Sequence, residues 1–161
     1  MSTTVETWTE EVVDVAGQSL HVDKGGSGEP LLLLHGEMGS VGWLRCHDAL
    51  AQHHTVMLPT HPGYGKTVRV NWARNMRDLA SWYLEALDDL GLDGIPVVGC
   101  GLGGWLAAEM AAASPKQFSK LIVASAPGIR PSQGEIFDMF LVVAKEYIEK
   151  SFLDPASSTE Y

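Results

Sequence analysis

The chain has 161 residues, 45% of them hydrophobic and 19% charged, with a formal net charge of −9 at pH 7, which predicts one soluble globular domain with a sizeable core. The negative charge argues against nucleic acid and anionic membranes as partners, no apolar run approaches the roughly 18 residues that span a bilayer, and no basic and apolar stretch typical of a signal peptide is present. These properties predict a cytoplasmic protein whose two cysteines, Cys46 and Cys100, stay reduced.

In chain order, the sequence predicts an antiparallel hairpin and then alternating strands and helices. Alternating apolar residues in Glu11–Val15 and Ser19–Asp23, joined by a glycine-containing turn, predict the hairpin. Continuous apolar runs predict strands that are buried on both faces, and apolar residues three or four positions apart predict helices. The expected elements after the hairpin are a strand Pro30–His35, a helix Trp43–Gln52, a strand Thr55–Leu58, a helix Asn75–Leu90, a strand and a helix within 96–113, and a strand Leu121–Ala124. This order predicts an α/β fold with a mostly parallel sheet and helices on both of its faces.

The composition changes after Ala126. A loop, Pro127–Pro131, precedes a strongly apolar segment that predicts one helix containing the residues from Ile136 to Ile148. A helix this apolar has to cover another surface, because it would not be stable alone in water. We therefore divide the chain into a core, residues 1–126, and a further segment, residues 127–161.

The most informative motif lies in Pro96–Met110, where a short apolar strand, a glycine turn and a helix of small residues follow one another. Gly99 and Gly103 fit the outer positions of the pattern G-x-S-x-G, whose serine is a nucleophile on a sharp strand-to-helix turn, the nucleophile elbow. The serine position is Gly101 here. Two further glycine loops follow predicted strands, namely His35-Gly36-Glu37 and Pro62-Gly63-Tyr64-Gly65.

In this order and spacing, the three motifs resemble the N-terminal two-thirds of the α/β-hydrolase fold family, over roughly residues 10–126. The segment from 127 onward is similar to the beginning of the family's cap, a helical insertion that roofs the active site. The resemblance implies a serine hydrolase acting on small, apolar esters or related carbonyl compounds, with no cofactor and no metal. It also places Gly101 at the nucleophile position, His35 and Gly36 in the oxyanion loop, and the backbone N–H groups of Glu37 and Leu102 in the oxyanion hole.

Two departures from the family pattern argue against catalysis. Gly101 has no side chain that could attack a carbonyl carbon, and glycine should stabilise the turn, because it adopts positive φ without strain. The family's acid and histidine follow the nucleophile, whereas the last histidine of this chain is His61. We therefore expect an incomplete α/β-hydrolase that lacks the C-terminal strands and shows no serine-hydrolase turnover.

Neighbouring polar residues do not restore the missing chemistry. Cys100 cannot take the centre of the motif, because the framing positions would then be Val98 and Leu102, and we expect a buried, inert thiol. His35 is expected to be a structural loop residue rather than a base. Three other histidines lack the cysteine or acidic partners of a metal site and are expected to be solvated near a helix end, namely His47, His53 and His54.

Three functions therefore remain open. The first is the incomplete hydrolase, and the second is a non-catalytic protein that binds a small apolar ligand under the cap. The third is a chain with no function of its own, which needs a partner chain to supply the missing strands. Without further strands beside it, Leu121–Ala124 would be an exposed sheet edge through which the chain could self-associate.

Overall fold

The computed structural model describes residues 8–128, 131–135 and 137–157. The chain divides into two compact units, Met1–Gly128 and Ile129–Tyr161, and each is described by itself. Within the described ranges, no helix combines the length and the apolar character needed to cross a membrane.

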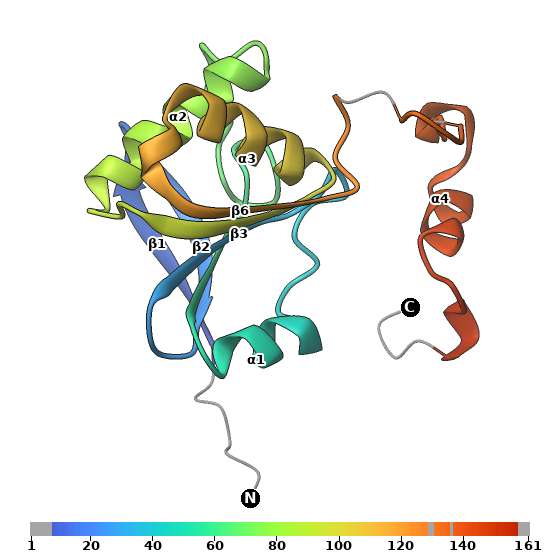
Figure 1. Ribbon diagram of the computed structural model, residues 1–161, viewed down its shortest axis with the longest axis horizontal. Helices are drawn as coiled ribbons and strands as arrows, with labels where there is room; N and C mark the ends of the chain where they lie inside the picture. The colour runs from blue at the N-terminus through green and yellow to red at the C-terminus, as the bar shows by residue number, and fades with distance from the viewer. Residues whose placement is uncertain (1–7, 129–130, 136, 158–161) are drawn as a thin grey trace, which may run out of the picture. The chain divides into compact units, whose positions relative to one another are not determined.

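The first unit is built on a six-stranded sheet with the order β1-β2-β4-β3-β5-β6 (Figure 1). Its strands are β1 Thr9–Val15, β2 Gln18–Gly25, β3 Pro30–Leu34, β4 Thr55–Pro59, β5 Ile95–Cys100 and β6 Phe118–Ala124. The pairs β1–β2 and β2–β4 are antiparallel, whereas β3–β4, β3–β5 and β5–β6 are parallel. The prediction of an α/β fold with a hairpin and a mostly parallel sheet is thus confirmed.

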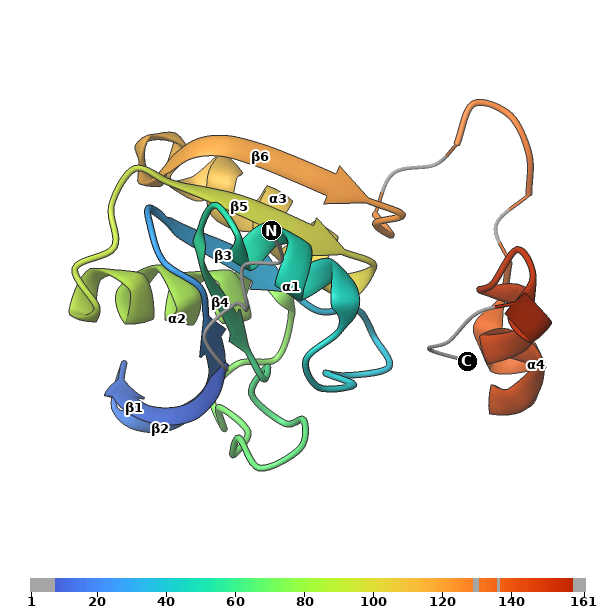
Figure 2. The same cartoon turned by 90° about the horizontal axis from the view of Figure 1, so that it is seen from below.

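Three helices cover the two faces of this sheet. α2 (Met76–Asp89) and α3 (Leu102–Ala113) lie on one face, and α1 (Arg45–Ala51) lies on the other (Figures 1 and 2). Asn75 caps the start of α2, because its side chain accepts a hydrogen bond from the backbone N–H of Asp78. The prediction of helices on both faces is therefore confirmed.

α1 is shorter than the predicted helix and begins at a histidine contact. The Nδ1 atom of His47 accepts a hydrogen bond from the backbone N–H of Leu44 at 3.0 Å. This contact satisfies one of the backbone donors before α1, and His47 is buried rather than solvated. The expectation of a solvated His47 was wrong.

Two hydrophobic clusters fix the sheet between its helices. The larger cluster lies between the sheet and α2 and α3, and it includes the fully buried rings of Trp82 and Tyr83. The smaller cluster lies under α1 and includes Leu31, Leu33 and Val56. The carboxyl ends of β3 and β5 are held between these clusters, which gives the loops after them a rigid base.

The second unit corrects the predicted apolar helix. Instead of one helix, a 3-10 turn at Met139–Leu141 is followed by α4, Ala144–Lys150. Val142 and Val143 are extended between them, with ψ values of 159° and 150°. Two adjacent β-branched residues fit an extended backbone well, and the Asp138 side chain closes the 3-10 turn by accepting the N–H of Phe140. Ile136, the first residue of the predicted helix, lies outside the described residues.

Candidate active site

The elbow motif forms the connection between β5 and α3. β5 ends at Cys100, α3 begins at Leu102, and Gly101 lies between them with φ 52° and ψ −122°. Its N–H donates to the carbonyl of Ala124 at 2.9 Å, and its own carbonyl accepts from the N–H of Gly104 at 3.0 Å. A positive φ is a conformation that residues with a Cβ rarely adopt, so glycine at position 101 removes backbone strain.

The two framing glycines are required by close packing. A Cβ atom on Gly99 would lie 2.6 Å from the carbonyl carbon of Gly103 and from the Cα of Gly104. A Cβ atom on Gly103 would overlap the carbonyl oxygens of Leu34 and His35. The start of α3 therefore packs directly against β5 and the end of β3, and positions 99 and 103 have no room for a side chain.

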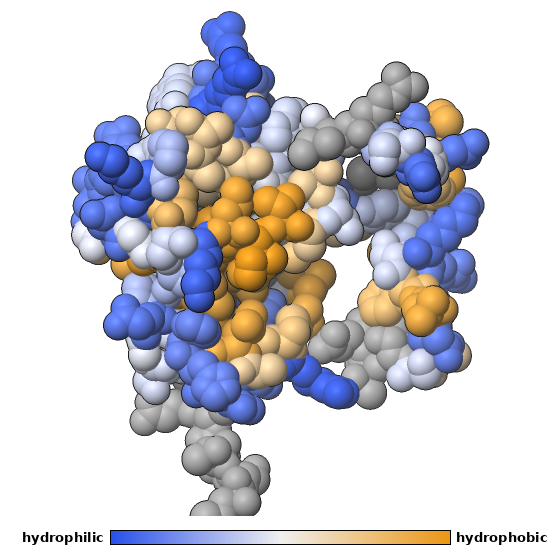
Figure 3. Space-filling model, in the orientation of Figure 1, coloured by the Kyte–Doolittle hydropathy of each residue, from blue (hydrophilic) through white to orange (hydrophobic). Residues whose placement is uncertain are grey.

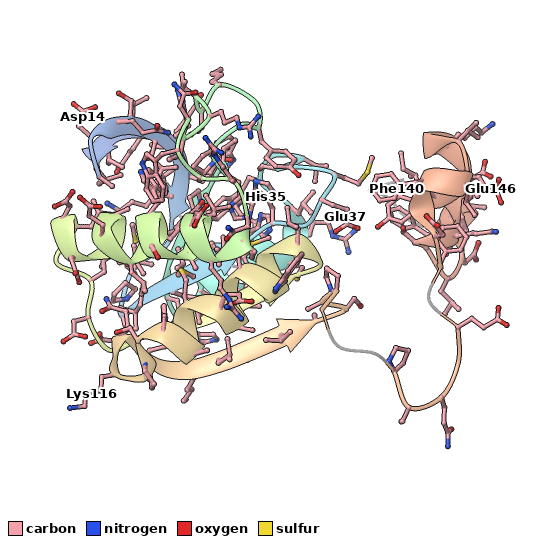
Figure 4. All side chains as sticks on the ribbon, turned by 90° about the horizontal axis from the view of Figure 1, so that it is seen from above. Asp14, His35, Glu37, Lys116, Phe140 and Glu146 are labelled. Carbon is pink, nitrogen blue, oxygen red and sulfur yellow. The ribbon has the colours of Figure 1, made fainter. Side chains whose placement is uncertain are left out.

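The loop after β3 meets the elbow directly. A Cβ atom on Gly36 would lie 3.5 Å from the carbonyl oxygen of Cys100, and one on Gly101 would lie 3.4 Å from the Cα of Gly36. The backbone N–H of Leu102 donates to the carboxylate Oε2 of Glu37 at 3.3 Å. Figure 4 labels Glu37 beside the first turn of α3. The structure thus brings together residues from two separate sequence motifs, namely Gly36 and Glu37 from one and Gly101 and Leu102 from the other.

The side chain of Glu37 is the part of this site that sequence reasoning missed. The sequence assigned Glu37 a role through its backbone N–H, and Leu102 the role of a free donor toward a substrate oxygen. In the structure, the Glu37 carboxylate accepts the hydrogen bond of that donor. An acidic residue in a loop expected next to a helix N-terminus was the available signal, because the helix dipole attracts negative charge there.

His35 belongs to a buried cluster of tilted and edge-on rings behind this loop. Its Nδ1 donates to the carbonyl of Gly36 at 2.8 Å, so its Nε2 is the acceptor for the backbone N–H of His61 at 3.0 Å. The Nε2 of His61 donates to the carbonyl of His35 at 3.0 Å, and its Nδ1 accepts from the hydroxyl of Tyr83 at 2.6 Å. Both rings use both nitrogens, and their centroids are 3.9 Å apart.

Burial keeps both histidines neutral. The pKa of His61 is lowered to about 3, chiefly by desolvation and next by the repulsion that a protonated His35 beside it would exert. Desolvation also lowers the pKa of His35. A neutral ring with both nitrogens engaged fixes a loop and has no site left to accept a proton from a nucleophile. No sequence pattern indicated the bond between His61 and Tyr83, which joins residues 22 positions apart.

A hollow of about 360 Å³ lies beside the loop that carries Glu37. Its lining includes Met38, Gly39 and Tyr64, and it also contains an ion cluster in which Glu10 binds Lys66 at 2.9 Å and His21 at 2.9 Å. The pKa of the half-buried Tyr64 is raised by desolvation and, next, by the negative charge of Glu37. The Tyr64 hydroxyl therefore stays protonated close to the Glu37 carboxylate.

Cys100 corrects another expectation. It is exposed rather than buried, because it is the last residue of β5, where the strand leaves the packed part of the sheet. Partial desolvation raises the pKa of its thiol, which disfavours the reactive thiolate. In the parts of the chain that the structure describes, no group of three or more His, Cys, Asp or Glu side chains could hold a metal ion.

Most of this core is similar in sequence to known proteins. Residues 29–146 match the family described as alpha/beta hydrolase fold. A 2-hydroxy-6-oxononadienedioate/2-hydroxy-6-oxononatrienedioate hydrolase of Paraburkholderia phymatum is 33% identical over 142 residues, 81% of this chain and 49% of its own length. The dihydrolipoyllysine-residue acetyltransferase component of the acetoin cleaving system of Pseudomonas putida is 28% identical over 84% of this chain and 38% of its own length. Among solved structures, the epoxide hydrolase CorEH superimposes with a TM-score of 0.70 and 27% identity, covering 93% of this chain and 53% of that protein. The chain thus spans about half, or less, of each relative.

Proposed function

Because the chain belongs to the α/β-hydrolase fold family, we propose that it is a hydrolase-type scaffold for small, apolar esters or related carbonyl compounds in which Gly101 has removed serine-type acyl transfer. The observation that carries this proposal is the position of Gly101 between β5 and α3 at positive φ. An acyl-transfer elbow needs an attacking atom at this position, and glycine has none.

The size of the expected loss follows from the behaviour of serine hydrolases that lose their nucleophile. In the serine protease subtilisin, removing the serine lowers turnover by about 10⁶-fold, and about 10³–10⁴-fold catalysis over water remains from the oxyanion hole and substrate binding. Here the residual part is reduced as well, because the Glu37 carboxylate accepts the N–H of Leu102. The two effects together support an elbow without serine chemistry.

A second candidate function is binding without turnover. The backbone frame of the elbow and its facing loop is intact, with Gly99, Gly103 and Gly36 in close contact with their neighbours. A frame that is kept while the attacking atom is lost favours a ligand-binding role. The relatives include a protein named as a hydrolase of oxo-diacids, which favours a carbonyl compound as the ligand class.

The experiment is an ester assay with the unmodified chain and with Gly101→Ser. With p-nitrophenyl acetate and butyrate, we expect no burst of p-nitrophenol and no acylated protein in the mass spectrum of the unmodified chain. A stoichiometric burst from the unmodified chain would overturn the proposal. Saturable binding of a non-hydrolysable ketone analogue, without any turnover, would select the binding function.

A further inference from the structure

One carboxylate oxygen of Glu37 makes two contacts at the elbow, one with the space beside Gly101 and one with the Leu102 amide. A Cβ atom on Gly101 would overlap Oε2 of Glu37 and lie 3.3 Å from its Cδ. The same Oε2 accepts the backbone N–H of Leu102 at 3.3 Å. The carboxylate therefore lies where a side chain of residue 101 would begin, and it holds the donor next to that position.

The electrostatics of α3 favour an anion at this point. α3 has 12 residues, Leu102–Ala113, and no acidic residue in its own first turn. The N-terminus of a helix carries a partial positive charge and unpaired N–H groups. Glu37 supplies the complementary negative charge from a different loop, 65 positions away in the sequence.

We propose that Glu37 is an internal ligand of the elbow, which occupies the Leu102 amide in place of an external oxyanion, and that Gly101 is the residue that admits it. Once Glu37 is removed, the site takes small monocarboxylates, because they carry the same group that now fills it. The inference rests on the proposed function in taking the elbow as the ligand site. It adds that the site is blocked by a carboxylate as well as lacking a nucleophile.

The same geometry makes Gly101 and Glu37 an energetically coupled pair. Any side chain at position 101 would meet the carboxylate and force it away from the Leu102 amide. Replacing Glu37 by alanine relieves that collision and leaves only the backbone strain of a positive φ. The effects of the two substitutions should therefore not be additive.

The first experiment follows the Leu102 amide by two-dimensional ¹H–¹⁵N NMR during titration with sodium acetate at constant ionic strength. The variants are Glu37→Ala and, as a matched control with the same change of charge, Glu85→Ala on the exposed face of α2. In Glu37→Ala we expect the Leu102 resonance to move from its native position and then to shift saturably with acetate. In the native chain and in Glu85→Ala it should hardly respond to acetate.

Two results of this titration would overturn the inference. One is a Leu102 amide that is unchanged by Glu37→Ala, and the other is a native amide that responds to acetate as strongly as the variant. If Glu37→Ala loses the dispersed spectrum of a folded protein, Glu37→Gln serves instead, because it keeps the size and one acceptor oxygen but removes the charge. In that variant, acetate should still compete for the amide, and a failure to do so would count against the inference.

The second experiment is a thermal double-mutant cycle with Gly101→Ala and Glu37→Ala. We expect Gly101→Ala to lower the Tm more in the native background than in the Glu37→Ala background. Equal decreases in the two backgrounds would show that the carboxylate does not occupy the place of a residue-101 side chain. Neither experiment depends on ester turnover, so the inference can fail while the proposed function stands, and the reverse also holds.

Discussion

Leu32 and Leu121 flank Val97 from opposite sides in one row of the sheet, yet their surroundings differ sharply. The register pairs Leu32 of β3 with Val97 of β5, and Val97 in turn with Leu121 of β6. Leu32 is 3% exposed and belongs to the main core, whereas Leu121 is 42% exposed. β3 lies in the interior of the sheet and β6 at its edge, and Figure 3 shows an apolar patch over this edge. Stability is thus concentrated in the central strands, and the edge strand is left with unburied apolar surface.

The largest expected effect on stability comes from replacing leucine by alanine in the core, and the same replacement at the sheet edge provides the comparison. Leu32→Ala should destabilise the fold by about 2–5 kcal/mol, because it leaves a cavity in a packed core. Leu121→Ala removes the same atoms from a side chain that water already reaches, so we expect a loss of about 1 kcal/mol or less. Urea unfolding followed by tryptophan fluorescence measures both. Similar losses for the two variants would mean that β6 is as well packed as β3.

A smaller effect comes from acid acting on the buried His61. Its pKa is about 3 in the fold and about 6.5 in an unfolded chain. Between these values the unfolded state binds a proton that the folded state does not, so the free energy of unfolding falls as the pH falls below 6.5. The loss should be about 2 kcal/mol by pH 5, since each pH unit corresponds to about 1.4 kcal/mol.

Urea midpoints at pH 7, 6 and 5 measure this acid sensitivity. His61→Gln should be less stable at pH 7 but should have a flatter pH profile. His53→Gln, at an exposed position, should keep the native slope. An unfolding free energy that stays constant from pH 7 to pH 5 would mean that His61 is not held neutral by burial.

How far the sequence predicted these features depends on the range of the interactions behind them. The strands and the position of Gly101 followed from apolar runs and glycine spacing, which are local patterns. The carboxylate contact of Glu37 and the ring contacts of His61 arise between segments far apart in the chain, so no local pattern contained them.

The errors have equally physical origins. Cys100 was expected to be buried once the motif register had excluded it as the nucleophile, but its position as the last residue of β5 leaves it exposed. The predicted helix after Ile136 rested on apolar composition without a helical period. The two adjacent valines, Val142 and Val143, interrupt it.

The last prediction concerns pairing between two copies of the chain at β6, and its substitutions are expected to change the stability of the monomer least. An antiparallel two-fold pairing centred on Leu121 would place Ile122 of each copy opposite Lys120 of the other, because residues opposite one another lie equally far from the centre. Ile122 is 55% exposed, so a charge there should be tolerated by the monomer. Ile122→Lys would set two lysines opposite each other on both sides of the axis, whereas Ile122→Glu would set a glutamate opposite each lysine.

We expect sedimentation velocity to show concentration-dependent association of the native chain, loss of this association in Ile122→Lys, and its retention in Ile122→Glu. A native chain that remains monomeric at all concentrations would contradict pairing at β6. Equal loss of association in both variants would mean that the copies meet through an unspecific apolar contact rather than through this register.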